Sequence, residues 1–433
     1  MTSAGGRAGR TRQVYILAGE FSAPRDASPV KVFRPFKDRA GLGSLDEMMF
    51  AACERSIQSL GGASAAARIT HLLGITFPGE QFFSTDVLNR FYDLKRRLGI
   101  HERCQVRFEI GSSDAGAVLF ASALHQLRGL DGPGTALVAA GQYIDPDADA
   151  INVVAHVVER EERELGMNMV AVGDMLLDQL AWRWRTEGRA PSSPHTDEEF
   201  EDFLDRWMDL KLELADEYPA AQRSLRDRTQ KPSWNRPMCR WMGHQHMAYL
   251  SKGACAVVIT TDRALVDEWI ARERSQGRRP RLVRVLGVGE GDARGVLTRR
   301  GEPLIYFKAM RQALSELRRA TGTNLDYLRA SAFMVLHDAF PSIEMGFLHS
   351  LGFAPVDVEQ RALTWWPNPY GGLLAFGHAL AASGLVQISR AFHAFTRPAE
   401  YTPRAEGKAL HPDFDRVDEP LHDSPLGLVG GPV

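Results

Sequence analysis

Two serines and an aspartate, Ser112-Ser113-Asp114, form a polar turn between the apolar segment 106–110 and an apolar, helix-like run over 117–127. A hydroxyl nucleophile at the start of a helix would gain from the free N–H groups and the dipole there, which favour developing negative charge. Serine and aspartate are also preferred helix caps. The turn therefore predicts either a cap or a nucleophile, and taken alone it favours the cap.

Two histidines lie in surroundings that are otherwise apolar. His337 begins the sequence His-Asp-Ala-Phe after a strand-like segment, and ligands commonly meet α/β folds at strand ends. His378 lies within the small and apolar run 371–384, where burying an imidazole costs free energy unless it has a partner. A core histidine bonded to backbone is the alternative in both cases. The two interpretations are even for His337, and the glycines around His378 favour function.

No set of residues has the spacing of a metal site. The chain has four cysteines, Cys53, Cys104, Cys239 and Cys255. None form a Cys-x-x-Cys pair, and none has a histidine at zinc-ligand spacing. His244 and His246 lack a third ligand and are interpreted as loop residues. We expect free thiols, a reducing compartment and no bound metal.

Length and charge narrow the class of protein. A chain of 433 residues is long enough for two core-sized units. The net charge of −2 gives no reason to expect nucleic acid or an anionic membrane as a partner. No stretch approaches the ~20 apolar residues of a spanning helix, and residues 1–12 do not lead into a signal peptide. We expect a cytoplasmic protein.

Strand and helix patterns alternate in the first part of the chain, which predicts an α/β layered unit. The expected strands are 14–18, 69–75, 106–110 and 135–140, and the expected helices are 45–60, 84–98 and 115–127. From about 159 to 240 the chain is charged, rich in tryptophan and helical by periodicity, which indicates an inserted region packed by those tryptophans.

Strand patterns return after this region. The expected strands are 254–260, 282–287 and 332–336, and the expected helices are 305–321 and 341–351. Residues 368–395 repeat the layout of the first motif, a small-residue turn that begins a long apolar helix, which hints at an internal duplication. The last segment, 396–433, contains six prolines and predicts an extended tail.

Together these motifs resemble the thiolase superfamily, nearest the sterol-carrier-protein-type thiolases. That branch carries a His-Asp-x-Phe box, matched by residues 337–340, and a segment similar to 250–264. It also carries an Asn-x-x-Gly-Gly turn leading to Gly-His-Pro, matched by Asn368, Gly371, Gly372, Gly377 and His378. The resemblance covers roughly residues 13–395.

The resemblance implies a duplicated α-β-α-β-α fold of five layers, usually dimeric. The expected parts are an N-terminal half over 13–150, a helical inserted loop region over 151–245, a C-terminal half over 246–395 and the Pro-rich tail over 396–433. The inserted region would cover a thioester substrate. Asn368 and the three glycines of the matched turn would bind it, with CoA or acyl carrier protein as its carrier and no further cofactor.

Three departures from the family pattern affect the implied chemistry. Ser112 stands at the position of the family's nucleophilic cysteine, Ala379 replaces the proline, and no cysteine follows Cys255 where the family has a Cys-x-Gly loop. A serine needs a base within hydrogen-bond reach. The resemblance gives that role to His378 and a thioester-oxygen contact to His337.

Three functions remain open at this point. The first is an acyltransferase of lipid metabolism that uses Ser112, His337 and His378 on an acyl-thioester. The second is a retro-aldolase acting on a β-hydroxyacyl-CoA with Tyr370 or Tyr249 as acid/base and an OB-fold protein as partner. The third is a silent subunit beside an active thiolase or ketosynthase chain.

Overall fold

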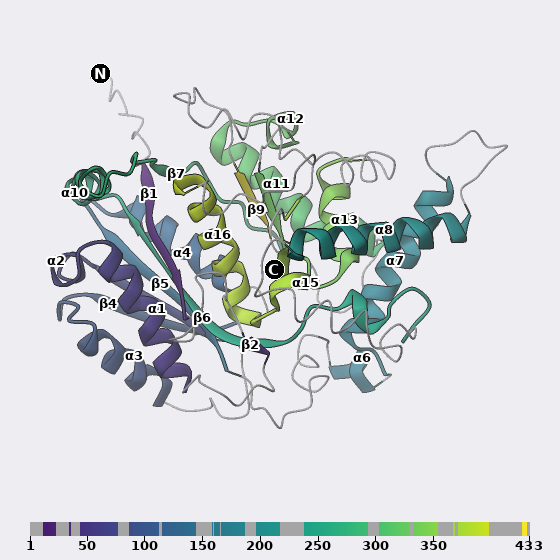
Figure 1. The fold of residues 1–433 in the computed structure, drawn as a ribbon, viewed down its shortest axis with the longest axis horizontal. Coiled ribbons are helices and arrows are strands. Elements are labelled where there is room, and N and C mark those ends of the chain that lie inside the picture. Colours follow the sequence, from purple (N-terminus) through teal and green to yellow (C-terminus); the bar gives the residue numbers. More distant parts are fainter. Residues whose placement is uncertain are drawn as a thin grey trace, which may run out of the picture.

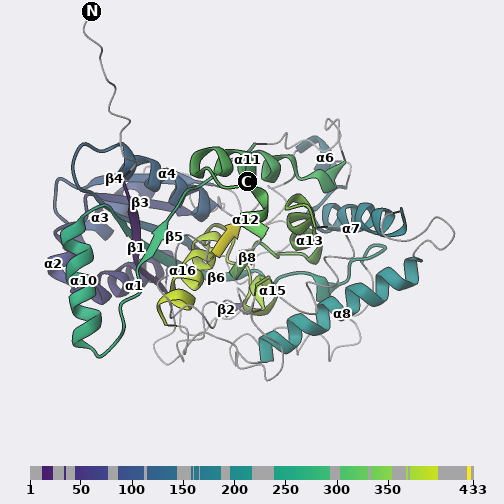
Figure 2. The ribbon, with the colours of Figure 1, turned by 90° about the horizontal axis from the view of Figure 1, so that it is seen from above.

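The computed structural model describes most of the chain, and Figure 1 gives its layout. The described residues are 12–22, 34–35, 44–76, 86–111, 115–143, 158, 160–164, 166–186, 196–216, 238–292, 303–329, 333–353, 367–368, 371–397 and 427–430. Figures 1 and 2 both show a twisted sheet and the helices that cover it at the left of the molecule. A group of helices lies at the right, and one helix, α16, lies between the two groups.

Seven strands of the described chain form one sheet, in the order β4-β3-β5-β6-β1-β7 with β2 paired to β6. They are β1 (Val14–Phe21), β2 (Arg34–Pro35), β3 (His71–Thr76), β4 (Gln105–Ile110), β5 (Thr135–Gln142), β6 (Ser251–Thr260) and β7 (Val283–Val285). The central strands β3, β5 and β6 are buried along their whole length, as expected for a sheet covered on both faces. Strands β3, β4 and β5 run parallel.

The helices beside this sheet follow the apolar periodicity of the sequence. They are α1 (Leu45–Ser59), α2 (Ala63–Ala66), α3 (Asp86–Arg97), α4 (Ala115–Gly129) and α10 (Arg263–Ser275). Helix α1 begins with a capping box, in which the Ser44 hydroxyl accepts a hydrogen bond from the Glu47 amide and the Glu47 carboxylate accepts one from the Ser44 amide. Two free helix N–H groups are thereby satisfied.

Strand β6 follows the boundary at 245 that we expected between the inserted region and the C-terminal half. It lies between β5 and β1 and is antiparallel to both. The strand that follows the inserted region thus completes the sheet of the N-terminal strands, although we expected it in the C-terminal half over 246–395. Period-two alternation shows that a segment is a strand and does not show which strands are its neighbours.

The inserted region is helical where the structure describes it. Its helices are α6 (Arg160–Glu164), α7 (Met169–Thr186) and α8 (Asp197–Asp216). An aromatic cluster packs α7 against α8: the ring of Trp184 stacks on that of Phe203 at a centroid distance of 4.8 Å, and Phe203 meets Trp207 edge-on at 5.6 Å. Trp182, in contrast, is exposed.

The C-terminal part contains shorter elements. They are η3 (Leu304–Tyr306), α11 (Lys308–Thr321), α12 (Leu325–Arg329), β8 (Phe333–Leu336), α13 (Pro341–Ser350), α15 (Gly372–Phe376), η4 (Leu380–Ala382), α16 (Ser383–Thr396) and β9 (Gly427–Gly430). Strand β9 pairs with β8 in parallel. The described part of the Pro-rich tail, 427–430, is therefore a strand.

The two helices that follow the small-residue turns, α4 and α16, pack against each other. Gly116 allows this approach, because a Cβ added there would lie 2.6 Å from the Ala381 carbonyl oxygen and 3.1 Å from the Leu385 Cβ. The long helix predicted within 368–395 is interrupted: α15 ends at Phe376, Gly377 has a left-handed φ of 94°, and α16 begins only at Ser383.

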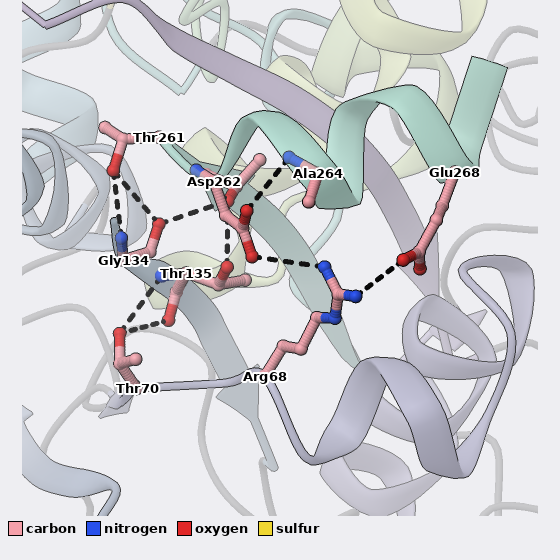
Figure 3. A network of polar contacts seen from close by, with 9 residues as sticks. Arg68, Thr70, Gly134, Thr135, Thr261, Asp262, Ala264 and Glu268 are labelled. Atoms are coloured by element: carbon pink, nitrogen blue, oxygen red, sulfur yellow. Dashed lines mark hydrogen bonds and ion pairs between the residues drawn. The ribbon is translucent and has the colours of Figure 1, made fainter. Parts of the chain in front are cut away.

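A threonine-rich network closes the end of the sheet where β3 and β5 begin (Figure 3). The Thr135 and Thr260 hydroxyls lie 2.8 Å apart on neighbouring strands, and the Thr70 hydroxyl donates to the Thr135 carbonyl oxygen at 2.9 Å. Asp262 caps α10 by accepting from the Ala264 amide at 3.0 Å and pairs with Arg68 at 3.3 Å. The network satisfies buried hydroxyls at the edge of the core.

Replacing Asp262 by alanine is expected to lower the free energy of unfolding by about 1 kcal/mol, because the α10 amide loses its acceptor. Asp262→Asn keeps an acceptor oxygen and serves as the control. The denaturation midpoint in urea measures both. Equal midpoints for the alanine and asparagine variants would show that the cap contributes nothing.

Candidate active site

The two histidines singled out by the sequence face each other inside the protein. His337 follows the last residue of β8, and His378 lies in the break between α15 and η4. Their rings are 4.9 Å apart, centroid to centroid, and meet edge to face at 83°. Only 2% of His337 and 6% of His378 is exposed. The fold therefore brings together two imidazoles from separate segments.

The backbone of His378 is held by the start of β6. Its amide donates to the Tyr249 carbonyl oxygen at 2.6 Å, and its carbonyl oxygen accepts from the Ser251 amide at 2.9 Å. Its Nδ1 lies 2.7 Å from the hydroxyl of Ser383, the first residue of α16. Gln387, one turn further along α16, donates to the carbonyl oxygen of Leu336 at 2.7 Å. Helix α16 thus contacts the segments of both histidines.

Burial, followed by the neighbouring His337, lowers the pKa of His378 well below its usual 6.5. The ring is therefore neutral at neutral pH and has one nitrogen able to accept a proton. If Nδ1–H donates to the Ser383 hydroxyl, the accepting nitrogen is Nε2, on the far side of the ring. A neutral buried imidazole of this kind fits the role of general base.

Close packing explains two glycines of the turn. A Cβ on Gly372 would lie 1.9 Å from a carboxylate oxygen of Asp338, and one on Gly377 would lie 2.1 Å from the Ser251 hydroxyl oxygen. Both residues also have positive φ, 66° and 94°, which disfavours side chains. Gly371, with φ of 82°, has a left-handed backbone as well. The binding of a thioester by these glycines stays a prediction.

Asn368 is buried and bonds to residues next to the His337 segment. Its Oδ1 accepts from the Leu336 amide at 2.7 Å, and its Nδ2 donates to Glu344 at 2.7 Å. The side chain thus fixes the end of β8, one residue before His337. A contact between Asn368 and a thioester is likewise a prediction.

The turn 112–114 and Tyr370 lie outside the described residues, so the predicted roles of Ser112 and Tyr370 stay predictions. The residues that flank the turn are described. Gly111 follows the last residue of β4, and its amide donates to the Thr76 carbonyl oxygen at 3.0 Å. On the other side, Gly116 packs against Ala381, three residues after His378. The flanks of Ser112 therefore lie at the carboxyl ends of parallel strands and beside the His378 segment.

Three residues around the histidines were not predicted from the sequence: Ser383, Lys211 and Glu344. Lys211 carries a signal in retrospect. It continues the buried face of α8, which is otherwise formed by Phe200, Phe203, Leu204, Trp207 and Met208. A lysine on an apolar helical face must have counter-ions, because an isolated buried charge is very costly.

The described residues contain no group of three or more His, Cys, Asp or Glu placed to hold a metal ion. His244 and His246 form a short 3₁₀ turn, and burial lowers the pKa of His246 to about 4. Of the helices in the described ranges, none is both long and apolar enough to cross a bilayer.

No known protein-family profile and no curated protein matches this sequence. Solved structures do match. Human mitochondrial 3-ketoacyl-CoA thiolase superposes with a TM-score of 0.55 at 13% identity, over 90% of this chain and 93% of that one. A monomeric SCP2-thiolase-like protein from Mycobacterium smegmatis gives 0.56 at 15%, over 89% and 72%. The chain has the thiolase fold.

A third match to this fold is an acetyl-CoA acetyltransferase from Syntrophomonas wolfei, with a TM-score of 0.55 at 13% identity over 90% of this chain and 94% of that one. The α/β class expected from the sequence is confirmed. At these identities the likeness establishes the thiolase fold, and the reaction has to be argued from the residues of the site.

Proposed function

We propose that this protein is a thiolase-like acyltransferase that acts on an acyl-thioester of CoA or acyl carrier protein. The observation that carries the proposal is the buried, edge-to-face pair of His337 and His378 within a thiolase fold. One of the matching human thiolase structures contains CoA. Ser112 is the proposed nucleophile; the described residue Gly116, four positions further on, packs against Ala381, three residues after His378.

In the proposed reaction, Ser112 Oγ attacks the thioester carbon while His378 Nε2 accepts the hydroxyl proton. His337 donates a hydrogen bond to the carbonyl oxygen, where negative charge develops. The carbon–sulfur bond then breaks, the thiolate takes the proton from His378, and the acyl group remains on Ser112 as an ester. An acceptor nucleophile, deprotonated by His378, completes the transfer and regenerates the serine.

The test is release of free thiol from acyl-CoA donors of increasing chain length, measured with the purified protein and an added acceptor. We expect thiol release that depends on the acceptor. Absence of release with every CoA and carrier-protein thioester, with the protein alone, would contradict the proposal and support a silent subunit that needs an active thiolase or ketosynthase chain.

A second candidate, retro-aldol cleavage of a β-hydroxyacyl-CoA, is supported by Tyr249, whose carbonyl oxygen bonds the His378 amide and whose side chain is half-buried. Cleavage of such a substrate without thiol release, lost in Tyr249→Phe or Tyr370→Phe, would favour this reaction. A requirement for a copurifying OB-fold protein would point the same way.

The neutral state of His378 predicts the pH dependence of the transfer. Because burial and His337 lower its pKa well below 6.5, the base stays deprotonated as the pH falls from 8 to 6, and loss of activity through its protonation begins only in more acidic solution. We therefore expect protonation of His378 to leave kcat/KM unchanged down to pH 6.5. Because burial raises the pKa of the nearby Glu344 to about 7, the profile is compared with that of Glu344→Gln, and an inflection at 6.5 or above that persists in this variant would contradict a buried neutral base.

We also propose a homodimer formed through β4. This strand is an edge of the described sheet, and its side chains are exposed or half-buried, with Ile110 48% exposed. Unpaired strand edges readily pair with a second copy. Light scattering should give twice the chain mass for the wild type and one chain mass for Ile110→Lys, with Trp182→Lys as the control. A monomeric wild type would contradict this proposal.

A further inference from the structure

A buried ionic cluster connects the inserted helix α8 to the segments of both histidines. Lys211 Nζ lies 2.9 Å from Asp338 Oδ2 and 2.8 Å from Glu344 Oε1, and none of the three side chains is exposed. Trp207, one turn earlier on α8, donates its indole N–H to Glu344 Oε2 at 3.0 Å. Helix α8 therefore makes charged and polar contacts with residues on either side of the start of α13.

Each carboxylate of the cluster also bonds to a histidine-bearing segment. Asp338 follows His337 directly, and its Oδ1 accepts from the Leu373 amide of α15 at 2.7 Å. Glu344 accepts from Asn368, whose own oxygen bonds the Leu336 amide before His337. The cluster thus fixes the end of β8 on both sides of His337 and ties it to the helix that leads to His378.

The two carboxylates of the cluster depend on the Lys211 ammonium. Burial by itself would lower the pKa of Lys211, but Asp338 and Glu344 together raise it. Burial raises the pKa of Glu344 to about 7, an effect that Lys211 opposes and Asp338 adds to. Two carboxylates this close would repel each other without the ammonium, and removing one partner of a buried ionic group leaves uncompensated charge.

We infer that Lys211 is a positioning residue, which holds Asp338 and Glu344 so that His337 and His378 keep their facing arrangement. Helix α8 is then part of the frame of the active site. The inference builds on the proposed function, because it assigns a role in that site. The coupling of α8 to α15 through Asp338 holds whatever the reaction is.

The experiment compares Lys211→Met with the wild type in two measurements. In the thioester assay we expect kcat to fall about 10²-fold, the scale of a misplaced catalytic group, while KM changes little because the substrate contacts remain. In hydrogen–deuterium exchange we expect peptides that cover Leu373 to lose protection, because its amide loses a fixed acceptor.

Arg240→Gln is the matched control. Arg240 pairs with Asp178 of α7 at 2.9 Å and Asp197 of α8 at 2.7 Å, in the same inserted region but half exposed. We expect it to change neither measurement, as for ordinary surface ion pairs. Equal effects in both variants would overturn the inference, and so would a Lys211→Met variant with unchanged kcat and unchanged protection at Leu373.

A second variant addresses the case in which Lys211→Met does not fold. The triple variant K211M/D338N/E344Q removes all three charges of the cluster, so no uncompensated charge is left buried. It still lacks the ammonium tether, so we expect low kcat and fast exchange at Leu373. Full recovery of both would overturn the inference, because Lys211 would then only balance charge. If the wild type shows no turnover, the proposed function fails and the exchange measurement alone decides.

Discussion

Replacing His378 by alanine is expected to lower the rate of acyl transfer by about 10³-fold, within the range attributed to a general base. The Ser112 hydroxyl is a weak nucleophile without a base, and the buried, neutral ring of His378 is the group proposed to take its proton. Steady-state rates of thiol release, with saturating acyl-CoA, measure the effect. The loss should appear in kcat, because the ring is not proposed to hold the carrier.

His393→Gln is the control for this result. His393 is also a buried histidine of the same part of the chain, with a pKa lowered to about 3 by burial and the neighbouring Arg397. Its Nε2 bonds the carbonyl oxygen of Gly19 in β1. Ser383→Ala should give a smaller loss than His378→Ala, because Nδ1 loses its partner while the base remains. Comparable losses in His378→Ala and His393→Gln would indicate general damage to the core.

Ser112→Cys and Ser112→Ala are expected to move the rate in opposite directions. Alanine removes the nucleophile, and we expect a loss of at least about 10³-fold, as in other hydroxyl nucleophiles that act with a base. Cysteine supplies a thiol that ionises near pH 8.5 and attacks thioesters readily. We therefore expect faster acylation of the cysteine variant, measured as the burst of thiol release in a stopped-flow experiment.

Ser113→Ala tests whether the adjacent serine acts instead. If Ser113 is a cap or turn residue, its loss costs about 1 kcal/mol of stability and leaves the rate unchanged. A rate that falls in Ser113→Ala and survives in Ser112→Ala would move the nucleophile by one residue. Undiminished turnover in both variants would favour the retro-aldol reaction, which needs no serine.

The sequence predicts the elements of the N-terminal part well, because their apolar patterns are local. The helix expected over 45–60 is α1, Leu45–Ser59, and the strand expected over 135–140 is β5, Thr135–Gln142. The place of β6 in the sheet, in contrast, could not be predicted from local patterns. Its partners, β1 and β5, lie more than a hundred residues away in the chain, and no local pattern specifies such a pairing.

In the candidate site, too, the sequence predicts the individual residues but not which of them meet in the fold. His337 and His378 are visible in the sequence as polar residues in apolar runs, and their meeting across 4.9 Å follows only from the fold. The helix break at Gly377 could not be predicted, because 371–395 is apolar throughout apart from a few residues and its apolar pattern continues across the break. The position of Lys211 on an apolar helical face indicates burial, but its counter-ions, Asp338 and Glu344, come from distant segments that no local pattern connects to it.

The most direct test of the acyltransferase proposal is the intact mass of the protein after brief incubation with acyl-CoA in the absence of an acceptor. We predict a mass increase of one acyl group, mapped by peptide sequencing to Ser112, which is lost in Ser112→Ala and strongly reduced in His378→Ala. An acyl group that persists in Ser112→Ala, or a wild-type protein that turns over thioester without ever carrying an acyl group, would contradict the proposal.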